Sequence, residues 1–334
     1  MKSTKAQVIE FCLPDLPDAG VRAEAFAPSN IALCKYWGKR DAELNLPVNG
    51  SLSISLGSLG TRTEITESDT GTDQVFLNGK AVVQDNPFAR KVVAFISLFR
   101  RELDQPVCIK TENNIPTAAG LASSASGFAA LMLALNDFYH LGLSHDRLSA
   151  FARMGSGSAS RSIYQGFVEW HKGNRADGMD SFAEPINITW PGFRVGLLKV
   201  ATGAKKIDSR SGMQRTVDTA ALYEQWPKQA EQDLQTIKRA LADQDFELLG
   251  QTAEHNALSM HATMIASWPP LLYWQPESVA AMQRVWELRS LGVPLYLTMD
   301  AGPNLKLLYL AEYEAQVRDA FPELLDIDIV VPFG

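Results

Sequence analysis

Cysteine is scarce in this 334-residue sequence, and long apolar runs are absent. The three cysteines, at positions 12, 34 and 108, are widely spaced and form no C-x-x-C pair, so they suit a reducing compartment and offer no metal framework. The longest apolar stretch, around Phe128–Leu135, is too short to span a bilayer. The N-terminal residues contain no signal-peptide core. We therefore expect a cytoplasmic protein with no membrane partner.

Positive charge is also in deficit. The sequence has 31 lysines and arginines against 38 aspartates and glutamates, which gives a net charge of −7 and a pI near 5.4. A broad nucleic-acid-binding surface is therefore disfavoured, although a local basic pocket is compatible with this balance. With 46% hydrophobic and 21% charged residues, the composition is typical of a soluble enzyme long enough for two lobes.

Two common nucleotide-binding signatures are missing, because neither G-x-x-x-x-G-K-[ST] nor G-x-G-x-x-G occurs. The chain has instead a small-residue stretch, 115–127, between a β-type run at Val107–Thr111 and an apolar segment at Phe128–Tyr139. A strand, a small-residue turn and a helix direct unpaired backbone N–H groups at a bound anion, and Ser123 and Ser124 add hydroxyl groups for phosphate or a metal ion. The stretch fits equally well a tight turn that packs its helix on a sheet.

Basic and aromatic residues occur together in Lys35-Tyr36-Trp37-Gly38-Lys39. The two lysines could line a pocket for a doubly charged oxyanion, although a surface loop anchored by its aromatic residues is the simpler interpretation. A second small-residue cluster, Gly155–Ser162, presents hydroxyl groups beside Arg161, whose planar guanidinium fits a carboxylate or a phosphate. Because this cluster leads directly into apolar residues, a binding site is favoured over a flexible linker.

Two further segments combine polar groups with turns. Asp300 follows an apolar strand, Leu295–Met299, and precedes a Gly-Pro turn. This position is typical of a catalytic carboxylate and also of an ordinary turn aspartate. Residues 205–213 are expected to form a basic, polar loop. His255 and His261 lie six positions apart, which is a poor spacing for ligands on one helix face, so neutral packing or capping roles are favoured over metal binding.

Hydrophobic periodicity predicts strands and helices, with a lobe boundary near residues 190–193. Residues 1–22 are expected to be a loosely packed lead-in, and Ser51–Leu56 a half-buried strand. The basic residues of a helix over 87–103 are expected on its solvated face. Further expected strands are 23–26, 61–66 and 193–200, together with a hairpin over 74–83 that turns at Asn78-Gly79. Further expected helices are 145–154, 217–242, 246–263 and 277–291.

Together these segments resemble the GHMP small-molecule kinase superfamily and, within it, the diphosphomevalonate decarboxylase family of the bacterial type. The resemblance runs in collinear order from about Ala27 to Asn304, which is nearly the whole chain. The pattern Pro-x-x-x-Gly-Leu-x-Ser-Ser is typical of the superfamily. The Lys-Tyr-Trp-Gly-Lys and Asp-Ala-Gly-Pro-Asn segments carry the narrower assignment.

The resemblance implies an α+β GHMP-kinase fold with two lobes around a deep cleft. Residues 1–190 would form an ATP-binding lobe similar to ribosomal protein S5, and residues 191–334 a lobe that carries the catalytic aspartate. It also implies ATP and Mg²⁺ as cofactors and (R)-mevalonate 5-diphosphate as substrate. ATP would phosphorylate the C3 hydroxyl, and loss of phosphate and CO2 would give isopentenyl diphosphate. Family members are commonly homodimers, so a homodimer without a nucleic-acid partner is expected.

Family roles transfer to matching positions of this sequence. Asp300 matches the carboxylate that positions the tertiary hydroxyl, Lys35 the cation beside it, and Arg161 the arginine that grips the substrate carboxylate. The positions expected to hold the diphosphate end or neighbouring substrate atoms are Tyr36, Lys39, Ser156, Ser158 and Arg210. The positions expected around ATP are Pro116, Ala119, Gly120, Leu121, Ala122, Ser123, Ser124, Ser126 and Ser209, with Ser123 as the candidate Mg²⁺ ligand.

One position departs from the eukaryotic members, which carry a phosphate-contacting arginine after a Leu-Asn-Gly hairpin. Phe88 stands at or near that position here, with Arg90 close by, so Arg210 is an alternative holder of the distal phosphate. Relatives that act on mevalonate 5-phosphate, either decarboxylases or 3-kinases, are therefore alternatives. A non-catalytic phosphometabolite-binding protein is an alternative from a different class. The complete set of Asp300, Lys35 and Arg161 favours the full decarboxylase.

Overall fold

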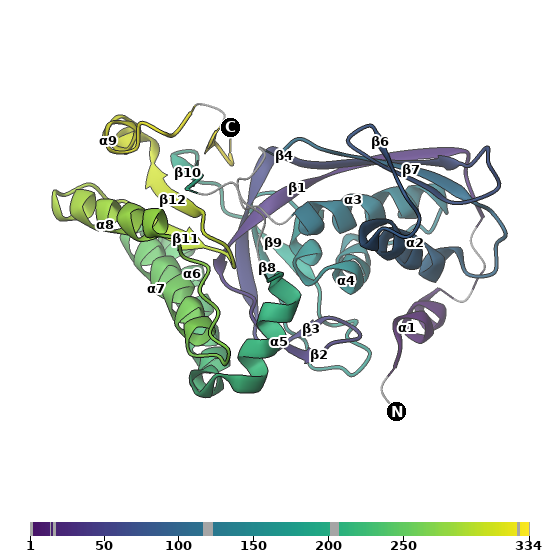
Figure 1. The fold of residues 1–334 in the computed structure, drawn as a ribbon, viewed down its shortest axis with the longest axis horizontal. Helices are drawn as coiled ribbons and strands as arrows, with labels where there is room; N and C mark the ends of the chain where they lie inside the picture. The colour runs from purple at the N-terminus through teal and green to yellow at the C-terminus, as the bar shows by residue number, and fades with distance from the viewer. Residues whose placement is uncertain are drawn as a thin grey trace.

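The computed structural model describes residues 3–13, 15, 18–115, 123–200, 207–325 and 328–333 of the chain. The described strands form two large sheets and a small two-stranded one, and helices pack against both large sheets (Figure 1). Within the described residues no helix is long and apolar enough to cross a membrane.

The first large sheet has seven strands in the order β6-β5-β7-β4-β8-β9, with β1 also paired to β4. The β1–β4 pair is long and antiparallel, and its register shifts between Pro28 and Asn30 and between Ala32 and Cys34. These irregularities bend the two strands where they approach the second sheet (Figure 1). The strands are β1 (Arg22–Cys34), β4 (Ser51–Glu67), β5 (Gln74–Leu77), β6 (Lys80–Val82), β7 (Val107–Asn113), β8 (Phe167–Trp170) and β9 (Ala183–Ile186).

Helix α3 (Ser123–Phe138) packs on β1 and β4, because small residues on one of its faces let the backbones approach closely. Ala129 and Ala130 are fully buried there, and the Ser126 hydroxyl bonds with Ser29 (3.2 Å) and Thr61 (2.7 Å). The other elements around this sheet are α1 (Lys5–Cys12), α2 (Pro87–Arg100), α4 (His145–Gly155), the 3₁₀ helix η1 (Gly157–Ile163) and a hairpin of β2 (Lys39–Asp41) and β3 (Leu46–Pro47).

The second large sheet has the order β11-β12-β10-β13, all antiparallel. Its helices α6 to α8 lie on the left of Figure 1. The strands are β10 (Phe193–Leu198), β11 (Tyr296–Met299), β12 (Leu305–Leu310) and β13 (Ile329–Val330). The helical elements are α5 (Ser209–Thr219), η2 (Ala221–Gln225), α6 (Trp226–Asp243), α7 (Phe246–Ile265), α8 (Pro276–Ser290), η3 (Ala311–Tyr313) and α9 (Glu314–Ala320).

One apolar cluster joins the two sheets. It contains Ile31 of β1 and Leu52 of β4 from the first sheet, together with Leu234 of α6, Leu249 of α7 and Leu308 of β12. All five side chains are at most 1% exposed. The ends of β1 and β11 are therefore held against each other by continuous packing, which fixes the relative position of residues that follow these strands.

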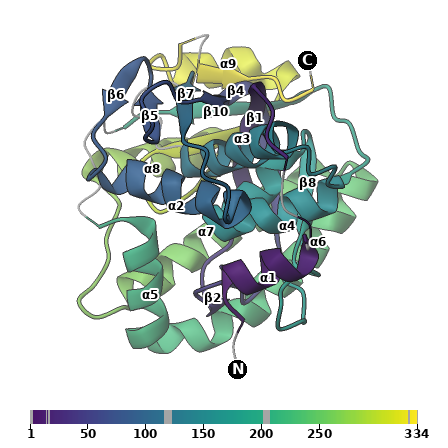
Figure 2. The same ribbon diagram turned by 90° about the vertical axis from the view of Figure 1, so that its right-hand side faces the viewer.

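The N-terminal residues differ from the loosely packed lead-in predicted from the sequence. Residues 5–12 form α1, which begins with a capping box between Thr4 and Gln7. Val8 and Ile9 are buried in the core of the first sheet. In Figure 2, α1 lies close to β2, and the Lys5 N–H donates to Glu43 Oε1 (3.4 Å) in the turn after β2. The helix is short and only weakly amphipathic, so its sequence shows no clear helical pattern.

Two strand predictions were also incomplete. The strand expected over 23–26 continues to Cys34, and the strands expected over 51–56 and 61–66 are parts of one strand, β4. The segment Ser51–Leu56 is buried on both faces rather than one. Its leucine and isoleucine side chains enter the cluster shared with α6, while Ser51 and Ser55 accept hydrogen bonds on the opposite face.

The hairpin at Asn78-Gly79 is confirmed, with φ of 50° and 74° at its two turn residues. The helix expected over 87–103 ends at Arg100, and two of its four basic residues are not on a solvated face. Arg100 forms two hydrogen bonds with the Asp73 carboxylate (2.7 and 2.9 Å), and Arg101 donates to the Leu13 carbonyl (2.8 Å). These contacts tie the end of α2 to neighbouring loops.

The basic loop predicted over 205–213 is partly helical. Asp208 is the N-cap of α5 and accepts hydrogen bonds from the backbone N–H groups of Arg210 and Ser211. Lys205 and Lys206 lie outside the described residues. The helix expected over 217–242 is divided into the end of α5, η2 and α6, with Pro227 in the first turn of α6.

Candidate active site

Lys35 and Asp300 form an ion pair between the ends of two strands, one from each large sheet. Lys35 directly follows β1 and Asp300 directly follows β11, and Lys35 Nζ lies 2.9 Å from Asp300 Oδ1. The lysine is 1% exposed, whereas the Asp300 side chain is 30% exposed. Burial lowers the pKa of Lys35, and the Asp300 carboxylate opposes that shift. The carboxylate is thus accessible while its cation is enclosed by protein.

Polar side chains hold the backbone on both sides of this pair. Lys35 N–H donates to Asn256 Oδ1 (2.8 Å), and the Lys35 carbonyl accepts from Asn49 Nδ2 (2.9 Å). His261 Nε2 lies 3.2 Å from the Asp300 carbonyl oxygen, which can only accept, so Nε2 carries the proton. Burial lowers the pKa of His261 to about 4, so the ring is neutral at pH 7. This agrees with the neutral packing role predicted from its spacing.

Arg161 lies in η1, is 3% exposed and hydrogen-bonds to neutral oxygen atoms. It donates from Nη1 to Ser51 Oγ (2.6 Å), and from Nε and Nη2 to Asn30 Oδ1 (3.4 and 3.3 Å). Its Cζ lies 5.7 Å from the centre of the Trp170 ring. Burial lowers the pKa of Arg161 to about 10, and Asp300 is the strongest opposing charge. A buried cation with such partners suits an anionic ligand near Asp300.

Asn30 and Ser51 orient this arginine, and sequence reasoning missed both. Asn30 also donates from Nδ2 to Ser162 Oγ (2.8 Å) and to the Ser158 carbonyl (3.3 Å), which fixes η1 against β1. Asn30 follows the buried Ser29 in β1, and Ser51 is the first residue of β4, so neither residue stands out from its sequence neighbours. Their role is visible only in their hydrogen bonds with Arg161.

In the Lys-Tyr-Trp-Gly-Lys segment Lys35, Trp37 and Gly38 are buried and the other two residues partly buried, so the segment is not a surface loop, although its aromatic anchor in the core is confirmed. Trp37 is 2% exposed, and its carbonyl accepts from Tyr223 Oη (3.1 Å). Gly38 has φ of 119°, and a Cβ there would lie 1.6 Å from Tyr223 Oη, so glycine is required. Tyr36 packs edge-on against Trp170, and its hydroxyl is buried with no hydrogen-bond partner among the described residues. An unsatisfied buried hydroxyl beside Arg161 is consistent with a ligand-binding role.

Two other cations, Lys5 and Arg210, lie near Lys39. Its Nζ donates to Asn45 Oδ1 (2.7 Å), and its pKa is lowered to about 8 by burial and by the charges of Arg210 and Lys5. Lys5 comes from α1 and Arg210 from the first turn of α5. The electrostatic contribution of Lys5 was missed because its segment was not expected to fold against the site.

Phe88, which stands at or near the position of the phosphate-contacting arginine of eukaryotic members, is partly buried on α2 against the core of the first sheet, and Arg90 is exposed.

The predicted phosphate-binding stretch is described only in part. Pro116, Ala119, Gly120, Leu121 and Ala122 lie outside the described residues. Ser123 and Ser124 begin α3, and Ser124 Oγ lies 3.3 Å from Ser156 Oγ, so the two small-residue clusters meet. Ser126 is fully buried and bonded to Ser29 and Thr61. Ser209 is the first residue of α5.

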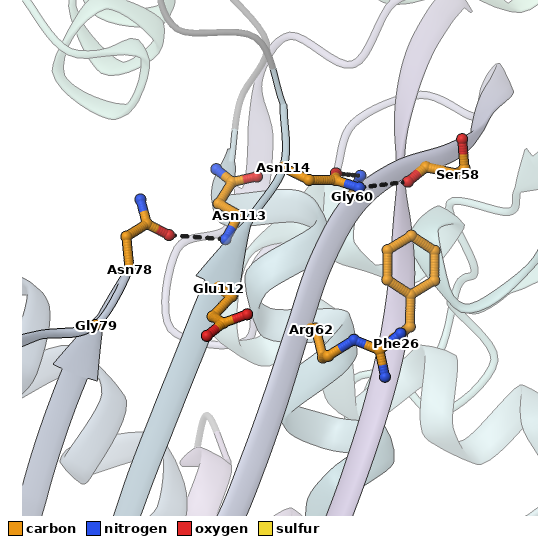
Figure 3. A pocket seen from close by; sticks show the side chains of 9 residues that line it. All are labelled: Phe26, Ser58, Gly60, Arg62, Asn78, Gly79, Glu112, Asn113 and Asn114. Atoms are coloured by element: carbon orange, nitrogen blue, oxygen red, sulfur yellow. Dashed lines mark hydrogen bonds between the residues drawn. The ribbon is translucent and has the colours of Figure 1, made fainter.

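A cleft of about 750 Å³ lies at the end of β7, between the middle of β4 and the turn of the β5–β6 hairpin (Figure 3). Asn113 and Asn114 line it and stand directly before the predicted phosphate-binding stretch. Asn114 bridges to β4, since Nδ2 donates to the Ser58 carbonyl (2.8 Å) and Oδ1 accepts from Gly60 N–H (2.7 Å). Neither asparagine was predicted as a site residue. The remaining lining residues are Phe26, Arg62, Asn78, Gly79 and Glu112.

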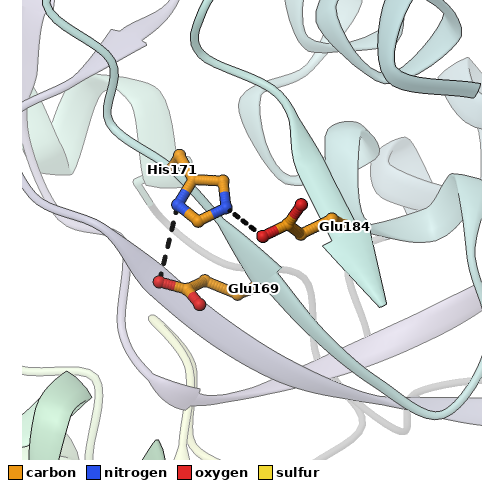
Figure 4. A group of neighbouring side chains, drawn as sticks. All are labelled: Glu169, His171 and Glu184. Carbon is orange, nitrogen blue, oxygen red and sulfur yellow. Dashed lines mark hydrogen bonds and ion pairs between the residues drawn. The ribbon is translucent and has the colours of Figure 1, made fainter. Parts of the chain in front are cut away.

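A separate ionic cluster lies on β8 and β9, where Glu169 and Glu184 are opposite each other in register. The His171 ring lies between them, with Nδ1 3.5 Å from Glu169 and Nε2 2.8 Å from Glu184 (Figure 4). Lys238 Nζ approaches Glu169 to 2.6 Å. Three such groups can hold a metal ion. Each nitrogen of the His171 ring faces a different glutamate, and Glu169 is also paired with Lys238 of α6. We therefore interpret the cluster as an ionic network that joins β8, β9 and α6.

Comparison with solved structures defines the class of protein. The chain superposes on the mevalonate diphosphate decarboxylase from Staphylococcus aureus with a TM-score of 0.85 and 39% identity, covering 93% of this chain and 94% of that chain. It superposes on MDDEF in complex with MVAPP, AMPPCP and magnesium with a TM-score of 0.84 and 40% identity, covering 93% and 95%. The fold is therefore the GHMP-kinase fold, as predicted from the sequence.

Sequence comparison defines the family. Residues 27–183 match the diphosphomevalonate decarboxylase-like N-terminal domain, and residues 197–328 match the mevalonate 5-diphosphate decarboxylase C-terminal domain. A diphosphomevalonate decarboxylase of Aspergillus fumigatus is 41% identical over 328 residues, which cover 91% of this chain and 80% of the relative. The chain belongs to the diphosphomevalonate decarboxylase family.

Proposed function

We propose that the protein catalyses the ATP-dependent decarboxylation of (R)-mevalonate 5-diphosphate to isopentenyl diphosphate, in a step of isoprenoid biosynthesis. The observation that carries the proposal is the convergence of Asp300, Lys35 and Arg161 from three different elements at the junction of the two sheets. Family membership and similarity to a structure in complex with MVAPP, AMPPCP and magnesium support it. ATP and Mg²⁺ are the proposed cofactors.

Asp300 positions the tertiary C3 hydroxyl and accepts its proton as the oxygen attacks the γ-phosphate of ATP. A tertiary alcohol is crowded and weakly acidic, so this step requires an ionised, oriented carboxylate. Lys35, 2.9 Å away, favours the ionised form and offsets negative charge on the transferring phosphoryl group.

Arg161 binds the substrate carboxylate and aligns its C1–C2 bond for cleavage. When the C3 phosphate leaves with the C–O bond pair, the C1–C2 bond breaks, CO2 departs, and the electron pair of that bond forms the C2–C3 double bond. Holding the carboxylate in this alignment can contribute several kcal/mol to the lowering of the barrier. The neutral partners of Arg161 leave its positive charge for the substrate.

The diphosphate end would be held by the basic residues around Lys39. We assign this role, or contact with neighbouring substrate atoms, to Tyr36, Lys39, Ser156, Ser158 and Arg210, as predicted from the sequence. Two observations support an anion at this position. The buried Tyr36 hydroxyl has no hydrogen-bond partner among the described residues, and an anion could accept its hydrogen bond. The pKa of Lys39 is lowered by neighbouring positive charges, and an anion would relieve that repulsion. Lys5 adds a further positive charge to this region.

ATP would bind along α3 and the cleft that precedes it. The first N–H groups of α3 suit phosphate, and the Asn113–Asn114 cleft offers donors and acceptors for the base. Pro116, Ala119, Gly120, Leu121, Ala122, Ser124, Ser126 and Ser209 are the proposed ATP contacts. The Ser123 hydroxyl is a hard oxygen ligand of the kind Mg²⁺ prefers, and the ion would neutralise charge on the transferring phosphoryl group.

We also propose a division into an ATP-binding lobe over 1–190 and a lobe carrying Asp300 over 191–334, and a cytoplasmic homodimer. The two family matches end at residue 183 and begin at residue 197, which brackets the proposed division. The described strands of the two large sheets fall on either side of it.

A time course followed by ³¹P NMR tests the proposed reaction. With ATP, Mg²⁺ and mevalonate 5-diphosphate, we expect ADP, phosphate and isopentenyl diphosphate to appear in equal amounts. ADP together with a stable 3-phosphorylated product would show a kinase instead. The absence of any reaction, with the substrate still binding, would support a binding protein.

Deprotonation of Lys39 is expected to weaken substrate binding at alkaline pH. Because its pKa is about 8, Lys39 loses its charge as pH rises past 8, while the substrate diphosphate stays ionised. We expect kcat/KM for mevalonate 5-diphosphate to fall above about pH 8, and kcat to stay level to a higher pH because bound diphosphate favours charged Lys39.

The matched test is Lys39→Arg, which keeps the charge beyond pH 10. The alkaline decline in kcat/KM should move to higher pH in this variant, even if its absolute value is lower. An unchanged decline would show that another group titrates, and would remove Lys39 from the diphosphate site.

A further inference from the structure

Lys306 on β12 is a buried charged group to which the proposed reaction gives no role. This lysine is 1% exposed, and its strand neighbours Leu305 and Leu307 are fully buried. A lysine in the middle of an apolar strand carries a large desolvation cost unless charged or polar groups compensate it. Sequence reasoning did not identify it.

The direction of the Lys306 side chain follows from strand alternation. Leu305, Leu307 and Tyr309 belong to the core cluster beneath α8 and α9, whereas Leu308 enters the cluster shared with β1. Lys306 is on the same face as Leu308, toward β1. Its directly opposite partner on β11, Thr298, also faces β1 and donates from Oγ1 to the Ala32 carbonyl (3.3 Å).

This direction places Lys306 at the carboxylate of Asp300. Its Nζ lies 3.7 Å from Asp300 Oδ2 and 3.4 Å from the Asn304 carbonyl, at the other end of the turn that carries the aspartate. Lys35 Nζ contacts the opposite oxygen, Oδ1, at 2.9 Å. Asp300 therefore has a buried lysine on each carboxylate oxygen, one from each large sheet.

We propose that Lys306 is a positioning residue for the reaction: together with Lys35 it holds the Asp300 carboxylate ionised and fixed in direction toward the substrate hydroxyl. The inference rests on the proposed role of Asp300 as the group that accepts the hydroxyl proton. A single lysine would leave the Asp300 carboxylate free to rotate about its side chain. Cations on both carboxylate oxygens define the plane of the carboxylate, and the hydrogen bond from Lys306 to the Asn304 carbonyl holds Lys306 in place.

Four charged or titratable groups surround Asp300, and none of them is expected to change the reaction rate near neutral pH. They are Lys35 at the end of β1, Arg161 in η1, His261 on α7 and Lys306 on β12. His261, with a pKa of about 4, is neutral across the working range. Arg161, with a pKa of about 10, is charged across it. At the acidic end His261 and Asp300 titrate in the same range, so only a shift of the acidic limb that appears in Lys306→Met and is reversed in Lys306→Arg is assigned to the contact between Lys306 and Asp300.

The test is the pH dependence of the single-turnover rate at saturating ATP and mevalonate 5-diphosphate. In Lys306→Met we expect the acidic limb to move to higher pH by about one unit, because one of two stabilising cations is lost. The rate should recover as pH is raised, and the KM for ATP should stay within about twofold of the original value. Lys306→Arg should restore most of the original limb.

Lys238→Met is the matched control, since it also removes a lysine from an ion pair with a mostly buried carboxylate, Glu169, outside the site. Its acidic limb should coincide with that of the unmodified protein. If the acidic limb of Lys306→Met also coincides with that of the unmodified protein, the inference is overturned. Asp300→Asn distinguishes failure of the proposed role of Asp300 from failure of the proposed role of Lys306. If Asp300→Asn is active, Asp300 does not accept the hydroxyl proton. If Asp300→Asn is inactive and the acidic limb of Lys306→Met does not move, only the role of Lys306 is excluded.

A measurement on the unmodified protein covers the case in which both Lys306 variants fail to fold. ¹³C-labelled aspartate carboxyl groups are titrated by NMR, and the Asp300 signal is assigned by its loss in Asp300→Asn. With two cations in contact, this carboxyl should titrate below the ordinary aspartate value of about 3.9. Titration at or above that value would overturn the inference.

Discussion

Asp300→Asn is expected to lower kcat by about 10²- to 10⁴-fold, which is the usual contribution of a positioned acid–base group. The amide has nearly the same shape but cannot accept the hydroxyl proton. Binding of ATP should be retained, because none of the proposed nucleotide contacts is on the turn that carries Asp300. Steady-state kinetics and calorimetric titration with an ATP analogue check the two halves of this prediction.

The substitution should also reduce stability, because it leaves buried Lys35 without its counter-charge. Removing one partner of a buried pair typically costs about 3–5 kcal/mol, although the partial exposure of Asp300 reduces the effect here. Asp73→Asn is a suitable control, since it breaks the Asp73–Arg100 pair, whose side chains are each 15% exposed, away from the site. That variant should be less stable but keep its kcat. Near-normal turnover in Asp300→Asn would exclude Asp300 as the essential group.

Arg161→Gln is expected to lower kcat/KM for mevalonate 5-diphosphate by roughly 10²- to 10³-fold, or about 3–4 kcal/mol. Glutamine can still bond with Ser51 or Asn30 but brings no charge to the substrate carboxylate. The KM for ATP should change little. Because the proposed role of Arg161 lies mainly in the cleavage of the C1–C2 bond, ADP should be released faster than CO2 in the first turnovers of this variant.

Arg161→Lys is the graded comparison, since it keeps the charge and loses the planar fork. Its rate should fall between those of the original protein and Arg161→Gln. If ADP and CO2 appear together at an unchanged rate in both variants, Arg161 does not hold the substrate carboxylate.

The sequence was most informative where chemistry requires particular residue types in a fixed order. The family resemblance assigned roles to Lys35, Arg161 and Asp300 from three short segments; Lys35 is paired with Asp300, and Asp300 is the strongest charge opposing the pKa shift of Arg161. The Asn78-Gly79 hairpin was equally predictable, because its backbone conformation strongly favours those two residues.

What could not be predicted depends on contacts between distant segments. The burial of β4 on both faces arises from packing against α6, which follows it by more than 150 residues. Asn30 and Ser51 become informative only when Arg161 is seen between them. Lys306 was overlooked because a lysine within an apolar strand has no local pattern, and its partner, Asp300, is across a turn.

The most direct test of the central claim is a parallel assay with ATP, Mg²⁺ and either mevalonate 5-diphosphate or mevalonate 5-phosphate, in which ADP and CO2 are both followed. We predict equal amounts of ADP and CO2 with the diphosphate and little of either with the monophosphate. CO2 mainly from the monophosphate, or ADP without CO2 from either compound, would contradict the proposed activity and indicate a different member of the superfamily.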